Sequence, residues 1–145
     1  MGVDNPAWRG CAPGRSGTVV ATMESSAVIT LPPTPSSARR ARHAVAEALH
    51  DRPAGVTDTA QLLATELVTN AVRHAGSPLT LRLECDEGAV LLAVSDESDA
   101  LPRPHDPQPD ELFGRGLVLV EALAADWGTE PGLVGGKTVW CVVEQ

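Results

Sequence analysis

The sequence predicts a two-layer α/β sandwich of the α+β class, with helices on one face of a mixed, mainly antiparallel sheet. Three observations predict it. Segments with alternating polarity or many β-branched residues are interleaved with segments whose apolar residues recur at helical spacing. Their order is strand, helix, helix, two strands, long loop, helix, strand. The two central strands are close enough in sequence to form a hairpin, and such elements pack as two layers.

The length of 145 residues suits one domain, since a chain of this size buries roughly 70% of its unfolded surface. Residues 1–24 carry Gly, Pro and Arg without a period. We therefore expect a disordered N-terminal tail there and a single domain over residues 25–145. With one Phe, three Trp and no Tyr, the core must consist mainly of Ala, Val and Leu.

The first part of the domain predicts one strand and two helices. AVITL (27–31) is a strand candidate that ends at PPTP. A serine in PSSARR caps a helix that runs to about His50. After the loop RPAG, a second helix begins with Thr57 as its N-cap and runs to about Ala75, and Gly76 stops it.

The second part predicts a hairpin, a loop, a helix and a last strand. The hairpin pairs residues 79–85 with residues 89–96 across a DEG turn. Residues 97–113 contain four prolines, and a loop of this length in a compact domain is usually functional or disordered. GRGLVLVEALAADW then gives a helix opened by two glycines, GTEPGLVGG is a turn region, and KTVWCVVE is the final strand.

Charge and cysteine usage exclude several classes of protein. The net charge is −8, and an acidic surface argues against nucleic acid or an anionic membrane as the partner. No segment approaches the ~20 apolar residues of a membrane span, and no secretory signal is visible. Cys11, Cys85 and Cys141 are far apart without a C-x-x-C pair, which fits a reducing cytoplasm rather than a disulfide or zinc site. Cys85 and Cys141 lie in expected strands as buried small hydrophobes.

The stretch GGKTVW resembles the end of a phosphate-binding P-loop, but the full pattern is absent. A P-loop needs a glycine five residues before Gly136, where the chain has Pro131. A helix must follow the lysine, whereas the residues after Lys137 are typical of a strand. The sequence therefore argues against a P-loop at this stretch, and the question of a nucleotide site stays open.

A polar stripe runs along the second helix. Glu66, Asn70 and His74 are spaced by four residues and share one face, beside a wide apolar surface. One interpretation is a solvated helix edge with a hydrogen bond that contributes only a few tenths of a kcal/mol. The other is a ligand-facing pair, in which the carboxylate of Glu66 is a general base and the amide oxygen of Asn70 binds magnesium.

Two further features border a possible ligand. Asp96 ends an apolar strand at the start of the long loop, where it is either a turn former or an acceptor for a ligand amine. Gly114 and Gly116 open the third helix, and glycines there act as a cap, as a hinge or as a close approach for phosphate. Arg115 between them adds a possible bidentate phosphate donor.

Together these residues resemble the Bergerat-fold, histidine-kinase-like ATPases. ELVTNAVRHA resembles their N-box, VSDES their first glycine box, GRGLVLVEALA their second glycine box and GGKTVW their closing strand. The resemblance covers about residues 24–145 and is closest to the anti-sigma factor serine/threonine kinases. It implies the Bergerat fold, ATP and Mg²⁺ as cofactors, and a homodimer.

The resemblance also implies the roles of individual residues. Asn70 would hold Mg²⁺ on the ATP phosphates, and Glu66 would activate the attacking hydroxyl. Asp96 would bind the adenine amino group, supported by Thr138, with Ser98 in the first glycine box. Gly114, Arg115 and Gly116 would contact the phosphates, and Leu117 would be a further nucleotide-binding residue. Residues 98–113 would form the ATP lid.

Two functional hypotheses follow. The first is an anti-sigma factor that transfers the γ-phosphate of ATP to a serine of an anti-anti-sigma (STAS) protein, or else binds a sigma factor. An arginine-rich face of the first helix either docks an acidic partner or is merely solvated. The second hypothesis is a nucleotide-binding or nucleotide-free interaction module without transfer chemistry. It is motivated by a departure from the family's D-x-G-x-G pattern, because Asp96 is followed by ESDA, without either glycine.

Overall fold

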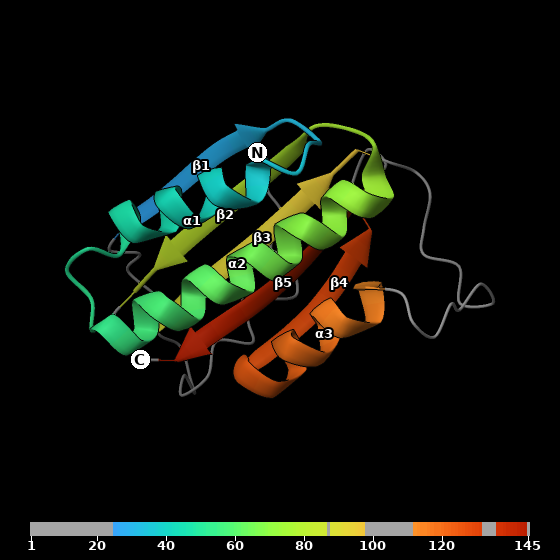
Figure 1. Ribbon diagram of the computed structural model, residues 1–145. Helices are drawn as coiled ribbons and strands as arrows, with labels where there is room; N and C mark the ends of the chain where they lie inside the picture. The colour runs from blue at the N-terminus through green and yellow to red at the C-terminus, as the bar shows by residue number, and fades with distance from the viewer. Residues whose placement is uncertain (1–24, 87, 98–111, 132–135, 145) are drawn as a thin grey trace.

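The computed structural model describes residues 25–86, 88–97, 112–131 and 136–144. Its strands are β1 (Ser25–Leu31), β2 (Leu79–Cys85), β3 (Ala89–Asp96), β4 (Asp126–Pro131) and β5 (Lys137–Glu144). Its helices are α1 (Ser37–Ala48), α2 (Ala54–Ala75) and α3 (Leu112–Leu123). The strands form one sheet in the order β1-β2-β3-β5-β4, and the helices cover one face of it (Figure 1). This confirms the α+β two-layer sandwich.

The sheet differs from the prediction in one respect. Each of its four strand pairs in the described part of the chain is antiparallel, so the sheet is not mixed. The central hairpin has the expected bounds, with Leu79 opposite Asp96 and Cys85 opposite Val90. The carboxylate of Asp86 accepts hydrogen bonds from the backbone N–H groups of Gly88 and Ala89, which closes the turn.

The N-cap of the long helix α2 is Pro53, four residues before the predicted N-cap Thr57. The ring of Pro53 fixes its φ at −57°, and its ψ of 144° is non-helical, as is usual for an N-cap. The Thr57 hydroxyl does not cap the helix but donates to the Leu49 carbonyl, 3.2 Å away. The predicted end is confirmed, since Gly76 is the C-cap and has a left-handed φ of 67°.

The C-terminal part contains an additional strand. The GTEP segment that was expected to be a turn instead belongs to β4, which pairs with β5 at the edge of the sheet. Pro131 is tolerated there because an edge strand needs hydrogen bonds on one side only.

Helix α3 starts at Leu112, so Gly114 and Gly116 lie inside its first turns rather than ahead of it.

Buried side chains form two clusters, one on each face of the sheet, because side chains alternate along a strand. The cluster beneath the helices includes Val90, Leu92 and Val94 of β3 and Val139, Cys141 and Val143 of β5. The second cluster consists of Ala89, Leu91, Ala93, Trp140 and Val142. Gly128 makes room for the Trp140 ring, since an added Cβ would lie 2.7 Å from it. The same alternation decides which strand-end residues face the helices.

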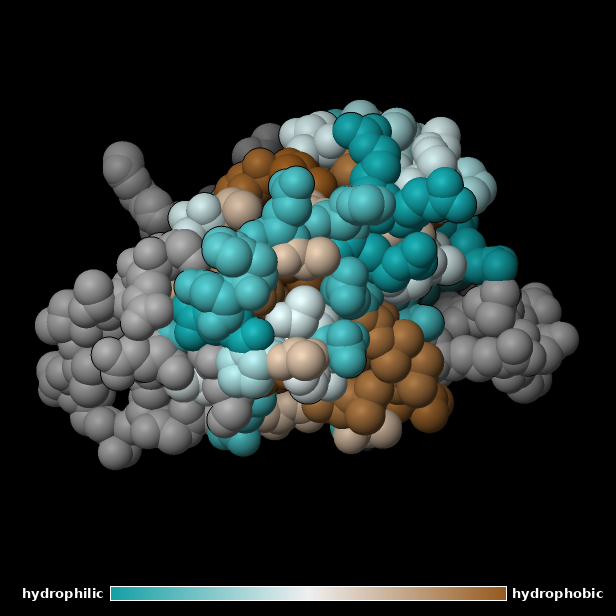
Figure 2. Space-filling view, turned by 60° about the vertical axis from the view of Figure 1, so that its left-hand side comes forward, coloured by the Kyte–Doolittle hydropathy of each residue, from teal (hydrophilic) through white to brown (hydrophobic). Residues whose placement is uncertain are grey.

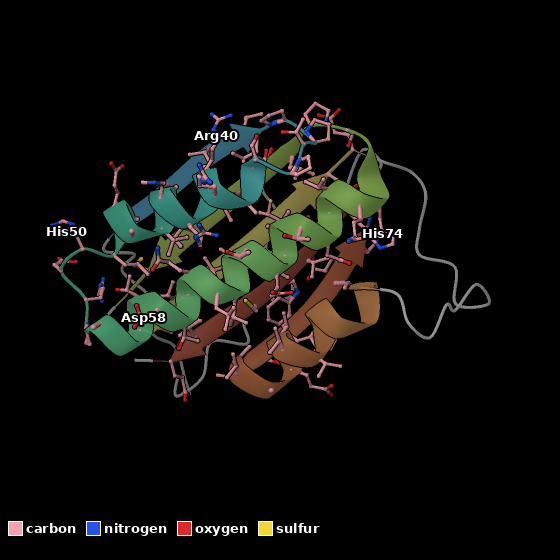
Figure 3. The ribbon with its side chains drawn as sticks, viewed as in Figure 1. Arg40, His50, Asp58 and His74 are labelled. Atoms are coloured by element: carbon pink, nitrogen blue, oxygen red, sulfur yellow. The ribbon has the colours of Figure 1, made fainter. Side chains whose placement is uncertain are left out.

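Arg39, Arg40 and Arg42 are exposed on α1, and Arg40 lies on the outer side of that helix (Figure 3). Hydrophilic side chains cover much of the face seen in Figure 2, while apolar ones gather in two regions of it, one near the top and a larger one at the lower right. Both expected buried cysteines, Cys85 and Cys141, are buried. Among the helices the structure describes, none has the length and apolarity needed to cross a bilayer.

Candidate functional site

An ion pair lies where β3 ends and β5 begins. Asp96 and Lys137 are cross-strand partners, and the Lys137 ammonium donates to Asp96 Oδ2 at 2.9 Å. The two side chains are only 3% and 6% exposed. Both residues are in phase with the core residues beneath the helices, so they face α2, whose C-terminal half lies over this end of the sheet (Figure 1). The pair is therefore buried between the two layers.

Gly136 allows the two strands to approach each other at this point. Its φ is 79°, and a Cβ on it would lie 2.0 Å from the Asp96 carbonyl oxygen. A side chain is excluded both by the backbone conformation and by the space. The second glycine of GGK is thus needed to bring Lys137 next to Asp96. The sequence did not predict that Gly136 lets the strands approach closely, nor that Lys137 pairs with Asp96, because GGK was compared only with nucleotide-binding motifs.

Thr138 lies away from Asp96, contrary to its expected supporting role. Its side chain is out of phase with Lys137 and points to the opposite face of the sheet. There Thr138 Oγ1 and Ser95 Oγ form a hydrogen bond of 2.8 Å. The alternation of apolar residues along β5 could have predicted this. Lys137 points to the same face of the sheet as Val139, whereas Thr138 points to the other face.

On α2, the expected metal ligand has the environment that such a role requires. Asn70 is 6% exposed, and its Oδ1 atom is buried without a hydrogen-bond partner among the described residues. An orphaned buried acceptor of this kind costs about 1–3 kcal/mol in the absence of a ligand. A hard cation prefers amide and carboxylate oxygens, so Asn70 fits a magnesium site.

The other members of the stripe become more exposed toward both sides. Glu66, one turn before Asn70, is half-buried. His74, one turn after Asn70, is exposed at the C-terminal end of α2 (Figure 3). The stripe thus runs from the layer interface to solvent. A carboxylate and an unpaired amide oxygen on one helix face can bind a cation and accept a proton next to it.

The second glycine box is described only in part. Gly114, Arg115, Gly116 and Leu117 lie in the N-terminal half of α3, at the same end of the molecule as Asp96 (Figure 1). Backbone N–H groups in the first turn of a helix have no intrahelical acceptor, so they can bind anions. The side chains of Arg115 and Leu117 lie outside the described part of the structure. So do Ser98 and residues 99–111 of the expected lid.

No group of three or more His, Cys, Asp or Glu side chains that could hold a metal occurs among the described residues. A magnesium ion at Asn70 would therefore need further oxygen ligands from phosphate and water, which is the usual way magnesium is bound in phosphate-transfer sites. The arrangement is suited to a metal that arrives with a polyphosphate.

Comparison with protein families agrees with this geometry. The model for the histidine kinase-like ATPase domain matches residues 31–142, from the end of β1 to β5. The match includes α2, Asp96, the start of α3 and the Asp96–Lys137 pair. A comparison with curated proteins gave no significant match.

Proposed function

The chain belongs to the histidine kinase-like ATPase family, and from this membership we propose that it is an ATP-dependent serine/threonine kinase acting as an anti-sigma factor. Its substrate would be a serine of an anti-anti-sigma (STAS) protein, and its second partner a sigma factor. The observation that carries the proposal is the buried Oδ1 of Asn70, which has no partner among the described residues and lies one turn from the half-buried Glu66. The partners and a homodimeric state follow from the resemblance of the motifs alone.

The proposed chemistry is an in-line phosphoryl transfer. Asn70 would hold a magnesium ion, and that ion would supply neutralisation of phosphate charge. Glu66 accepts the proton of the substrate serine, whose oxygen forms a bond to the γ-phosphorus while the bond to the β–γ bridging oxygen breaks and ADP leaves. Asp96 accepts a hydrogen bond from the adenine amino group. The first turn of α3 supplies backbone N–H groups to the phosphates.

Calorimetric titration with Mg²⁺-ATP tests the site directly, on the wild-type chain and on Asn70→Ala. We expect the wild type to bind and the variant to lose at least about tenfold in affinity, because the direct metal ligand is gone. Absence of binding by the wild type at millimolar ATP would overturn the kinase proposal. Equal affinity of the two chains would remove Asn70 from the site.

A second candidate is an interaction module that binds nucleotide without transferring phosphate. The ESDA residues after Asp96, where the family pattern has two glycines, favour it. The variant Glu66→Ala distinguishes the kinase from the interaction module. In a kinase it abolishes phosphorylation of the STAS protein and leaves ATP affinity nearly unchanged, since the base contacts the substrate hydroxyl. In an interaction module, Glu66→Ala leaves cellular function intact.

A further inference from the structure

Lys137 is a buried ammonium with unused hydrogen-bonding capacity. It is the sole lysine of the sequence, and its side chain is 6% exposed. A lysine ammonium carries three donors. Asp96 Oδ2 accepts one of them, and no other described residue supplies an acceptor to the Lys137 side chain. Burying donors without acceptors is unfavourable, so the structure suits an acceptor that arrives with a ligand.

The position of the ammonium determines which ligand atom it can reach. It is held 2.9 Å from Asp96 by a cross-strand pairing and by the tight approach at Gly136. A buried acceptor and a buried donor therefore lie side by side, facing α2. Adenine presents the complementary pair on one edge, because its exocyclic amino group is a donor and the adjacent ring nitrogen N1 is an acceptor.

We propose that Lys137 is a base-recognition residue that donates a hydrogen bond directly to N1 of adenine while Asp96 accepts from the amino group. This inference rests on the proposed nucleotide site and adds a specific contact to it. The ammonium remains bound to the carboxylate, and the base edge completes the set of hydrogen bonds. Guanine also has a donor next to an acceptor, so the contact is tested at N1 rather than by comparing ATP with GTP.

The test is a titration of the full chain, with Mg²⁺, by three nucleotides. ATP carries N1, 1-deaza-ATP replaces N1 by a C–H group, and 7-deaza-ATP keeps the whole recognition edge and is the matched control. We expect the wild type to bind 1-deaza-ATP at least about tenfold more weakly than ATP, as for loss of a hydrogen bond to a charged group. 7-deaza-ATP should bind like ATP. Equal binding of ATP and 1-deaza-ATP would overturn the inference.

The variant Lys137→Met, titrated with ATP and with 1-deaza-ATP, completes a double-mutant cycle in which the protein donor and the ligand atom N1 are each removed in turn. We expect it to bind ATP as weakly as the wild type binds 1-deaza-ATP, and to bind both nucleotides alike. Persistent discrimination at N1 would assign the contact to another donor. Tighter ATP binding would mean that Lys137 competes with the base for Asp96. Either result overturns the inference.

Two further comparisons keep the test decisive. Lys137→Met leaves the Asp96 carboxylate buried without its cation, so its folding is checked by thermal unfolding. If it does not fold, Lys137→Gln replaces it; this variant keeps an N–H donor and should retain part of the discrimination at N1. Complete loss of discrimination in a folded Lys137→Gln would contradict a simple donor role. Failure of the wild type to bind any of the three nucleotides would overturn the proposed function as well.

Discussion

The Asn70 side chain is arranged for a ligand at the expense of stability. Its Oδ1 atom is buried and has no hydrogen-bond partner among the described residues. Burial of this atom therefore does not stabilise the protein when no ligand is bound. We expect Asn70→Leu, of similar size, to leave the free energy of unfolding unchanged or to raise it by about 1 kcal/mol. Chemical denaturation without nucleotide measures this. Thr69→Ala, at the neighbouring position, is the control. A loss of more than about 2 kcal/mol in Asn70→Leu would mean that Asn70 has a structural partner instead.

Because of Cys141, the free energy of unfolding should decrease as the pH rises into the alkaline range. Burial raises the pKa of its thiol from 9.0 to about 12. The unfolded chain therefore ionises first, so the contribution of this thiol is complete below about pH 9 and is lost as the pH rises toward 12.

The pH effect is measured as the difference between two denaturation profiles. Between pH 9 and 10.5, the wild type should lose up to about 1.4 kcal/mol per pH unit more than Cys141→Ala, whose side chain does not titrate. Lower overall stability of the variant does not affect the comparison, because only the slopes are used. Parallel profiles would contradict the burial of the thiol.

At the scale of elements, the sequence predicted those whose signal is local. The β2–β3 hairpin has alternating residues and a turn acid, and its bounds agree with the prediction. β4 was missed because Asp126 and Trp127 were assigned to the end of the third helix and GTEP, with its glycine and proline, to a turn. The segment becomes a strand only by pairing with β5. The start of α3 was placed late, since glycines were interpreted as a boundary although they lie within the helix.

The start of β5 depends on one glycine, and the chain offers two controls for it. We expect Gly136→Ala to destabilise by more than about 2 kcal/mol, because the Cβ meets the Asp96 carbonyl and φ is positive. Gly76→Ala has a positive φ but open space, so it should lose about 1 kcal/mol. Gly55→Ala, in α2 with open space, should be neutral or stabilising. Equal losses at Gly136 and Gly76 would show that the contact with Asp96 is unimportant.

For the whole molecule, the candidate site is a product of tertiary packing. Asn70 comes from α2, Asp96 from β3 and Lys137 from β5, and the fold brings these three elements to one end of the sheet (Figure 1). The sequence motifs predicted the first two residues. They could not predict the pairing of Asp96 with Lys137, because that contact depends on the strand order and register rather than on any local pattern.

A ligand that contacts all three elements should stabilise the whole fold. At a nucleotide concentration of about 100 times Kd, Mg²⁺-ATP adds about 2.7 kcal/mol to the free energy of unfolding, which thermal unfolding detects as a higher Tm. We expect EDTA to remove most of this shift, because without the metal the Asn70 oxygen has no partner and faces the phosphates directly. Glu66→Ala is the matched control and should keep the full shift, since the base contacts the substrate hydroxyl rather than ATP. A shift that is unchanged by EDTA would show that nucleotide binding does not depend on a metal at Asn70.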